Sequence, residues 1–206
     1  MKGEEVMKCK YVTIEREYGS GGTKIARLLS EECRVPCYGR EILEAVAKRM
    51  DISVERIEQY EEKATNSLLY TLVMMGRAQA GNSDMLTAEG VIYLEEQEEI
   101  RKMAMEGKTI FLGHCASEAL KDKEGVIRVF IRSGSNEEKR QRIREDYGIA
   151  QKDIDATQKF YDRKRANYYY ANTSKNWKNL SNYDIVLDST ALGIEGCVSV
   201  LKGLFG

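Results

Sequence analysis

The chain has one proline, Pro36, and one histidine, His114, among its 206 residues. A single proline excludes proline-rich linkers and favours one compact unit. A single histidine, with no cluster of side chains at ligand spacing, argues against a protein metal site. No apolar run reaches the roughly 18 residues that a membrane span requires, and the first residues lack the apolar core of a signal peptide.

The chain also has few cysteines and no excess of positive or negative charge. The cysteines are odd in number and form no C-x-x-C pair, which predicts reduced thiols in a cytoplasmic protein; they are Cys9, Cys33, Cys37, Cys115 and Cys197. The net charge is −1, from 32 basic and 33 acidic side chains. This balance does not favour nucleic acid or a membrane surface as a partner, so a small-molecule ligand is expected.

Short apolar strands alternate with helices at both ends of the chain. Strands are predicted at 11–15, 35–38, 109–113, 126–132 and 183–187. Helices are predicted at 23–33, from a Ser135/Glu138 capping box through 144, at 153–170, and from a Thr190 cap to 204. Helical patterns also fill 40–106, with breaks near Asp51, Thr65 and Gly81. The alternation predicts an α/β fold whose parallel sheet is covered by helices on both faces.

One domain is expected, with two helical blocks inserted into a core. The core comprises 8–39, 107–134 and 180–206, and the insertions comprise about 40–106 and about 135–178. In the first insertion a packed helix face is predicted, made of Leu68, Leu69, Leu72, Met74 and Met75. Ligands of such folds bind beyond the carboxyl ends of the strands.

The first strand runs into a glycine-rich loop, "REYGSGGTKIA", at residues 16–26. A strand–loop–helix turn of this kind points backbone N–H groups and a helix N-terminus at one spot, where a phosphate binds. Phosphate contacts are therefore predicted from Gly19, Ser20, Gly21, Gly22, Thr23 and Lys24. An ordinary glycine-rich turn is the alternative.

The loop departs from the phosphate-loop pattern G-x-x-x-x-G-K-[ST]. Laid on the chain, the pattern places Arg16 at its first glycine and Gly22 at its lysine, while Gly21 and Thr23 match. The charge of the missing lysine must then come from elsewhere. Arg16 is the favoured source over Lys24, because it leaves the strand end and can fold back over the loop.

Four stretches, in order, resemble the cytidylate kinase-like family of phosphate-loop proteins. They are "VTIEREYGSGGTKIARLLSEECRVPCYGREIL", "IFLGHCASEAL", "YDRKRANYYYANTSKNW" and "NYDIVLDSTALGIE". The resemblance implies a five-stranded parallel sheet of the P-loop NTPase, nucleoside monophosphate kinase-like type, with a helical acceptor-binding insertion and a lid. It also implies ATP as donor and Mg²⁺, the latter reached by Thr23.

The resemblance also suggests residues that act on phosphate or acceptor. Arg163 and Arg165 fall in the lid-like stretch, where arginines neutralise the transferring phosphoryl group; the alternative is an exposed, solvated helix face. Arg40 follows the second strand, at an acceptor site or in a surface ion pair. His114 replaces the family's arginine and either contacts ligand or caps locally. Asp188 contacts a ligand or only forms a turn.

Two further predictions concern packing. Cys115 is expected to be a small buried residue rather than a nucleophile. Of Tyr168, Tyr169 and Tyr170, one or two are expected in the core, because three successive residues cannot share a helix face. A base-stacking role for one of them remains an alternative.

Three functions remain open from the sequence. The first is a nucleoside monophosphate kinase-like phosphotransferase that uses ATP and Mg²⁺, with CMP as one candidate acceptor. The second is a module that binds a nucleotide or phosphorylated ligand without turnover, favoured by the missing lysine and by His114. The third is a kinase for a different small acceptor, favoured by Gly39, which stands where the family has an aspartate.

Overall fold

The computed structural model describes residues 9–59 and 88–205. Its centre is a five-stranded, all-parallel sheet in the order β2-β3-β1-β4-β5. The strands are β1 (Tyr11–Arg16), β2 (Cys37–Tyr38), β3 (Thr109–Leu112), β4 (Val126–Arg132) and β5 (Ile185–Asp188). The predicted α/β class and the five-stranded parallel sheet are both confirmed.

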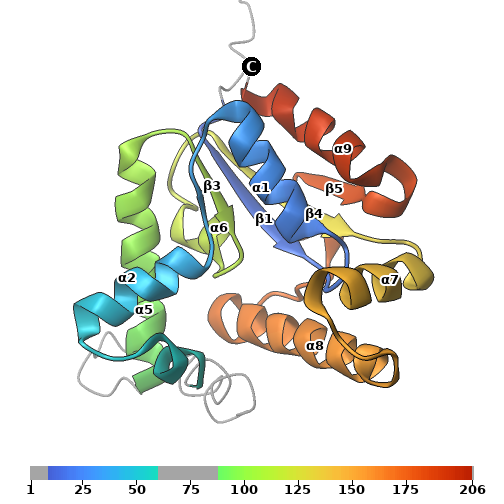
Figure 1. Cartoon of the computed structure of the whole chain (residues 1–206). Helices are drawn as coiled ribbons and strands as arrows, with labels where there is room; N and C mark the ends of the chain where they lie inside the picture. The colour runs from blue at the N-terminus through green and yellow to red at the C-terminus, as the bar shows by residue number, and fades with distance from the viewer. Residues whose placement is uncertain (1–8, 60–87, 206) are drawn as a thin grey trace, which may run out of the picture.

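Helices connect the strands and cover the sheet (Figure 1). They are α1 (Gly22–Cys33), α2 (Arg40–Met50), α5 (Ala88–Met103), α6 (Ala116–Ala119), α7 (Asn136–Tyr147), α8 (Ile154–Thr173) and α9 (Ser189–Lys202). Single 3-10 turns occupy Ala104–Glu106, Gln151–Asp153, Leu180–Asn182 and Gly203–Phe205. The break predicted near Asp51 is the end of α2. The breaks at Thr65 and Gly81, and the face from Leu68 to Met75, lie outside the described residues.

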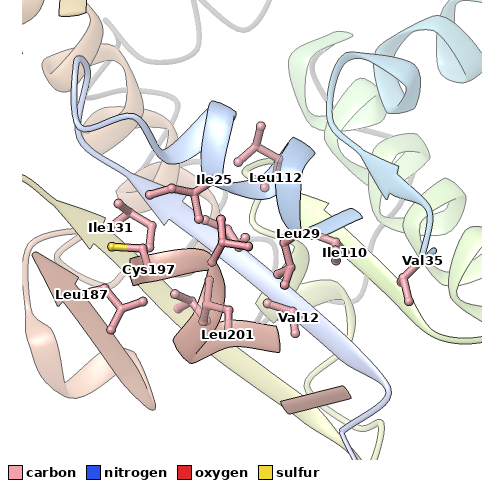
Figure 2. Close-up of a cluster of buried hydrophobic side chains, with 14 of the residues drawn as sticks. Val12, Ile25, Leu29, Val35, Ile110, Leu112, Ile131, Leu187, Cys197 and Leu201 are labelled. Atoms are coloured by element: carbon pink, nitrogen blue, oxygen red, sulfur yellow. The ribbon is translucent and has the colours of Figure 1, made fainter. Parts of the chain in front are cut away.

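One face of the sheet packs against α1 and α9. Alternation along β1 sends Val12 and Ile14 to this face, where Ile25 and Leu29 of α1 and Leu201 of α9 meet them (Figure 2). All five side chains are at most 1% exposed. This packing fixes the position of α1, and therefore of the glycine loop that precedes it.

The opposite face packs against α2, α5, α6 and α8. Phe111 of β3 lies with Ile42 of α2 and Ile100 of α5 in one cluster. Phe130 of β4 lies with Tyr169 of α8 and with Trp177 in another. Because α5 and α8 both seat on this face, they bring side chains far apart in sequence to the carboxyl ends of β1 and β3.

The helix caps are partly as predicted. Ser135 caps α7, since its Oγ accepts a hydrogen bond from the Glu138 amide at 3.2 Å. The prediction that Thr190 caps α9 is wrong: Asp188 is the cap, and its Oδ1 accepts from the Thr190 amide at 3.0 Å. The Thr190 hydroxyl instead accepts from the Ser135 amide, so it joins α9 to the start of α7.

Residues 9–59 and 88–205 contain neither a membrane-spanning helix nor a cluster of metal ligands. None of the helices there combines the length and apolar character needed to cross a membrane. Nor does any group of three or more histidine, cysteine, aspartate or glutamate side chains in this part of the chain offer a metal site.

Candidate functional site

The glycine loop joins the carboxyl end of β1 to the first turn of α1, as predicted. Gly19 and Gly21 have φ of 74° and 77°, a left-handed conformation that favours glycine. The Ser20 amide bonds to the Glu17 carbonyl at 3.3 Å, and the Gly22 amide lies 3.4 Å from Ser20 Oγ. No described residue accepts a hydrogen bond from the amides of Gly19 or Gly21, so the loop retains donors beside a helix N-terminus.

Close packing also requires glycine in this loop. A Cβ at Gly19 would lie 2.9 Å from the Lys139 carbonyl oxygen and from Ile143 Cγ1 of α7. A Cβ at Gly21 would overlap Ile194 Cδ1 of α9. These contacts show that α7 and α9 press on the loop, and that its glycines are needed whether or not phosphate binds.

Arg16 occupies the space where a side chain at Gly22 would begin. A Cβ at Gly22 would lie 2.5 Å from Arg16 Cβ and 2.9 Å from Arg16 Cγ. The Arg16 side chain continues to Gly113 at the end of β3, where a Cβ would lie 2.5 Å from its Nη1. The arginine thus crosses from the loop to the neighbouring strand, in contact with the pattern's lysine position.

A cavity of about 170 Å³ lies at the carboxyl ends of β1 and β3, under α8. Its lining residues come from three elements and are Glu15, Arg16, Gly113, His114, Tyr161, Lys164, Arg165, Tyr168 and Tyr169. The place agrees with the rule that ligands of open parallel sheets bind beyond the strand ends. Of the predicted site residues, the structure brings Arg16, His114 and Arg165 together here.

The cavity wall carries more positive than negative charge. Arg16, Lys164 and Arg165 line it, against the carboxyl of Glu15. Burial, and then the adjacent Arg165, lower the pKa of Arg16 to about 9, which still leaves the guanidinium charged at neutral pH. Arg16 Nε is buried and has no hydrogen-bond partner among the described residues. Two buried guanidinium groups side by side favour an anion between them.

Burial disfavours the ionised form of Glu15, the acidic residue in the cavity wall. Burial raises the pKa of Glu15, while Arg16 and the Trp177 indole offset part of that rise. Trp177 Nε1 donates to Glu15 Oε2 at 3.1 Å. Burial thus disfavours the charge that would neutralise the arginines, which supports an anionic ligand at this site.

The helix α8 is fixed onto the glycine loop. Asp162 Oδ1 accepts from the Tyr18 amide at 2.7 Å, and Arg165 Nη1 donates to the Arg16 carbonyl at 3.0 Å. The Tyr18 ring stacks on Tyr161 at 4.7 Å between centroids. The alternative of an exposed, solvated helix face does not hold for Arg165, because packing against the loop leaves it only partly exposed and burial lowers its pKa.

His114 is held from two sides by α5. Its Nδ1 lies 3.2 Å from Glu96 Oε2, and its carbonyl accepts from Gln97 Nε2 at 3.2 Å. Glu96 Oε2 also accepts from the Tyr168 hydroxyl at 2.6 Å. His114 has φ of 55° and Cys115 has φ of 51°, so two non-glycine residues in succession adopt the left-handed conformation. Strained backbone of this kind is concentrated at functional sites.

Other predicted site residues lie elsewhere. Arg40 is exposed and pairs with Glu58 at 2.9 Å, and Arg163 is exposed outside the cavity lining. Asp188 accepts from the Gly134 and Thr190 amides, which agrees with the turn alternative. Thr23 and Lys24 are exposed in the first turn of α1. Ligand roles for these residues remain predictions.

The two packing predictions are confirmed. Cys115 is 1% exposed, and burial is the environment expected for an unreactive cysteine. Tyr169 is buried, Tyr168 is half-buried at the cavity, and Tyr170 is 47% exposed. The helix therefore directs one of the three rings into the core and one into the cavity wall.

Sequence reasoning missed the residues that hold the site. Lys139 of α7 pairs with Glu17 Oε2 at 2.6 Å, with both side chains largely buried. Arg142 donates to Ser189 Oγ at 3.1 Å and to Glu138, and lies beside the loop. Glu96 falls in the run "EEQEE", which reads as a solvated face. Spacing could have predicted its burial, because Ile92 and Ile100 lie four positions before and after it on the same helix face.

The chain is similar to one protein family and to several solved structures. A profile of the cytidylate kinase-like family matches residues 11–191. No curated protein matches the chain. Among solved structures, an uncharacterized protein from Eubacterium ventriosum is similar, with 23% identity, 95% of this chain and 97% of that chain covered, and a TM-score of 0.69.

Two further solved structures are more distant. TT1252 from Thermus thermophilus is 15% identical over 95% of this chain and 96% of that chain, with a TM-score of 0.52. Shikimate kinase from Bacteroides thetaiotaomicron is 13% identical over 94% and 96%, with a TM-score of 0.49. At these identities the first two structures share the fold alone, and the third likeness carries no conclusion.

Proposed function

Because the chain belongs to the cytidylate kinase-like family, we propose that it is a phosphotransferase. It moves a phosphoryl group from ATP, bound with Mg²⁺ at the glycine loop, to a small acceptor in the adjoining cavity. CMP is the acceptor that the family description suggests first. Little covalent chemistry is needed from the protein in such a transfer, which depends on positioning and on electrostatic stabilisation.

The observation that carries the proposal is the contact between Arg16 and Gly22. A phosphate loop needs a cation that reaches the donor phosphates, and the lysine of the pattern normally supplies it. Here the stem of Arg16 fills the space beside Gly22, and its charged end lies between the loop and the cavity. Arg16 therefore supplies the missing charge from the other end of the same loop.

The residues of the loop fit a bound nucleotide. The Gly21 amide, which no described residue uses, and the start of α1 are suited to phosphate oxygens. The exposed Thr23 hydroxyl is suited to Mg²⁺, which usually keeps several waters and takes the rest of its ligands from substrate phosphates. ATP would supply the transferable phosphoryl group, and Mg²⁺ would offset its negative charge.

The lid-like helix supplies the remaining charge. Arg165 and Lys164 face the same cavity as Arg16, where a group in transfer carries negative charge on its oxygens. The guanidinium group of Arg165 is held by its bond to the Arg16 carbonyl and by its position over the Tyr18 ring. This preorganisation is the property that makes electrostatic stabilisation effective.

A nucleotide-binding module without turnover is the second candidate. It is favoured by Gly22, which stands where the phosphate-loop pattern has its lysine, and by His114, which stands where the family has an arginine. Such a module would bind ATP without consuming it.

The test is ligand-induced stabilisation followed by turnover. ATP with Mg²⁺ at about 100 times its dissociation constant should add about 2.7 kcal/mol to the free energy of unfolding. The Arg16→Ala variant should lose that stabilisation, whereas Arg27→Ala, an exposed position on α1, should keep it. Stabilisation with release of ADP on addition of an acceptor supports the kinase, and stabilisation without turnover supports the module. A chain that no nucleoside triphosphate stabilises would contradict both.

A further inference from the structure

The cavity holds a histidine in the arrangement of a proton acceptor. Glu96 is fully buried, with 0% side-chain exposure, and its Oε2 lies 3.2 Å from His114 Nδ1. A carboxylate oxygen can only accept, so in the neutral ring this contact places the proton on Nδ1 and the lone pair on Nε2. The ring itself lines the cavity. The sequence offers no second histidine for this role.

Neighbouring side chains hold the His114 ring and backbone in one position. Successive residues of α5 hold it, Glu96 at the ring and Gln97 at the carbonyl. Tyr168 of α8 donates to the same carboxylate oxygen, which orients the carboxylate. The left-handed backbone at 114 and 115 costs free energy that the surrounding packing must offset.

The cavity has room for one small group of the acceptor and opens to solvent beyond it. Its volume of about 170 Å³ is close to the roughly 150 Å³ of an engineered cavity that holds one benzene ring. The part of the acceptor that meets His114 and the cationic side chains is therefore a small ring or a short chain.

We propose that His114 takes the proton of an acceptor hydroxyl, and that the acceptor is a small hydroxyl compound with one anionic group rather than a nucleoside monophosphate. The inference rests on the phosphoryl transfer proposed above. Arg16, Lys164 and Arg165 recognise the anionic group, which is a carboxylate or a phosphate. A phosphate acceptor is already a nucleophile at neutral pH and needs no base, whereas a hydroxyl benefits from one.

The transfer forms one bond to phosphorus, breaks another and moves one proton. The hydroxyl oxygen forms a bond to the γ-phosphorus of ATP as the bond from that phosphorus to the bridging oxygen breaks, and the electron pair leaves on ADP. The hydroxyl proton moves to Nε2 of His114, and the resulting imidazolium is stabilised by the buried Glu96 carboxylate 3.2 Å from Nδ1. The proton passes to solvent when the products leave. Glu96 is a positioning residue here, because it acts through His114.

A single-histidine chain makes the first readout direct. With ¹⁵N-labelled histidine, the full-length protein gives one imidazole, and its nitrogen shifts report which nitrogen carries the proton. The wild type should show the Nδ1–H form near neutral pH. Glu96→Gln should lose that preference, while Glu98→Gln, at an exposed position of the same helix, should retain it. An Nε2–H form in the wild type would overturn the proposal without bearing on ATP binding.

The second readout is transfer itself, measured with ATP and three sets of acceptors. Hydroxy acids such as glycerate, gluconate and shikimate test the carboxylate source, and glycerol 3-phosphate and ribose 5-phosphate test the phosphate source. CMP, UMP and AMP test the nucleotide alternative. Slow ATP hydrolysis, in which water replaces the acceptor, is measured alongside. Faster ADP release with a compound of the first two sets than with any nucleotide is expected.

His114→Gln then separates a base from a binding residue. With the best acceptor, or with water, kcat should fall by roughly 10²–10⁴ while the KM for ATP stays unchanged. The fall in kcat toward low pH that is expected for the wild type should also disappear. If CMP is the preferred acceptor and His114→Gln turns it over at the wild-type rate, the proposal is wrong although the kinase function stands. Failure of the wild type to bind ATP would instead refute the function on which it rests.

Discussion

Exchanging Arg16 and Gly22 should reveal that they act as one unit. The double variant Arg16→Gly/Gly22→Lys creates the full pattern G-x-x-x-x-G-K-T from residue 16 to residue 23. Glycine rather than alanine is needed at position 16, because the Cβ of Arg16 itself would lie 2.5 Å from a Cβ at position 22. The Arg165 side chain donates to the backbone carbonyl of residue 16, so this bond does not depend on the side chain there and survives the exchange.

The single variants should each be defective for a different reason. Carbon atoms pack best at about 3.5–4.0 Å, so Gly22→Lys alone forces an overlap of about 1 Å with Arg16 and should cost about 1–3 kcal/mol of unfolding free energy. Arg16→Gly alone removes the buried charge and should lower transfer on the order of 10²–10³-fold. It also adds a glycine to a strand end, at a cost of roughly 0.5–1 kcal/mol.

The double variant should lose less stability and less activity than the summed losses of the two single variants. The overlap is gone and a cation is restored beside the loop, so the coupling free energy should favour the pair by about 1–3 kcal/mol in stability. Urea unfolding of the four proteins gives this coupling, and ATP binding with single-turnover transfer gives the functional one. Additive losses in both measurements would refute the idea that Arg16 stands in for the lysine. Arg27→Ala serves as the unrelated surface control.

The remaining predictions concern stability at the site. Arg165→Ala should lower the free energy of unfolding by about 1–3 kcal/mol, because it removes a hydrogen bond to a part-buried carbonyl, whereas exposed Arg163→Ala should change it by less than about 0.5 kcal/mol; equal losses in thermal melts would contradict this. Gly21→Ala should cost about 1–3 kcal/mol more than Gly148→Ala, because both have positive φ but only the first meets a neighbour, Ile194. Because the folded-state pKa of Glu15 is raised, the folded chain binds more protons than the unfolded chain above the ordinary carboxyl pKa. Stability then falls as pH rises above the ordinary carboxyl pKa, and Glu15→Gln should gain stability relative to the wild type over that rise.

Local pattern was enough to predict the framework. Strand positions follow from apolar, β-branched runs, and the parallel sheet follows from their alternation with helices, because both depend on residues close in sequence. The glycine loop was located for the same reason, since a strand, its turn and the next helix are contiguous. The Ser135 cap was predicted correctly, but the reciprocal bond of a capping box does not form, because the Ser135 amide donates to Thr190 Oγ1. The α9 cap was misplaced by two residues because Asp188 and Thr190 are both good caps.

Contacts between distant segments decided the chemistry of the site. The sequence showed that Arg16 and Gly22 depart from the pattern together, but only the fold shows that one side chain fills the space left by the other. The sequence favoured phosphate roles for both Arg163 and Arg165, but only the packing of α8 on the loop shows that Arg165 lines the cavity and Arg163 does not. Which charges become buried depends on how helices seat on the sheet, a property that no local pattern encodes.

The Glu96–His114 pair is the clearest case. The two residues lie 18 positions apart, on α5 and just after β3, and nothing local to either one links them. The sequence determined that a phosphate-loop fold would form and that a histidine would follow the third strand. Tertiary structure decided that a buried carboxylate would meet that histidine, because α5 packs through Ile92 against α2 and through Ile100 against the cluster around Phe111, and it carries Glu96 inward between them.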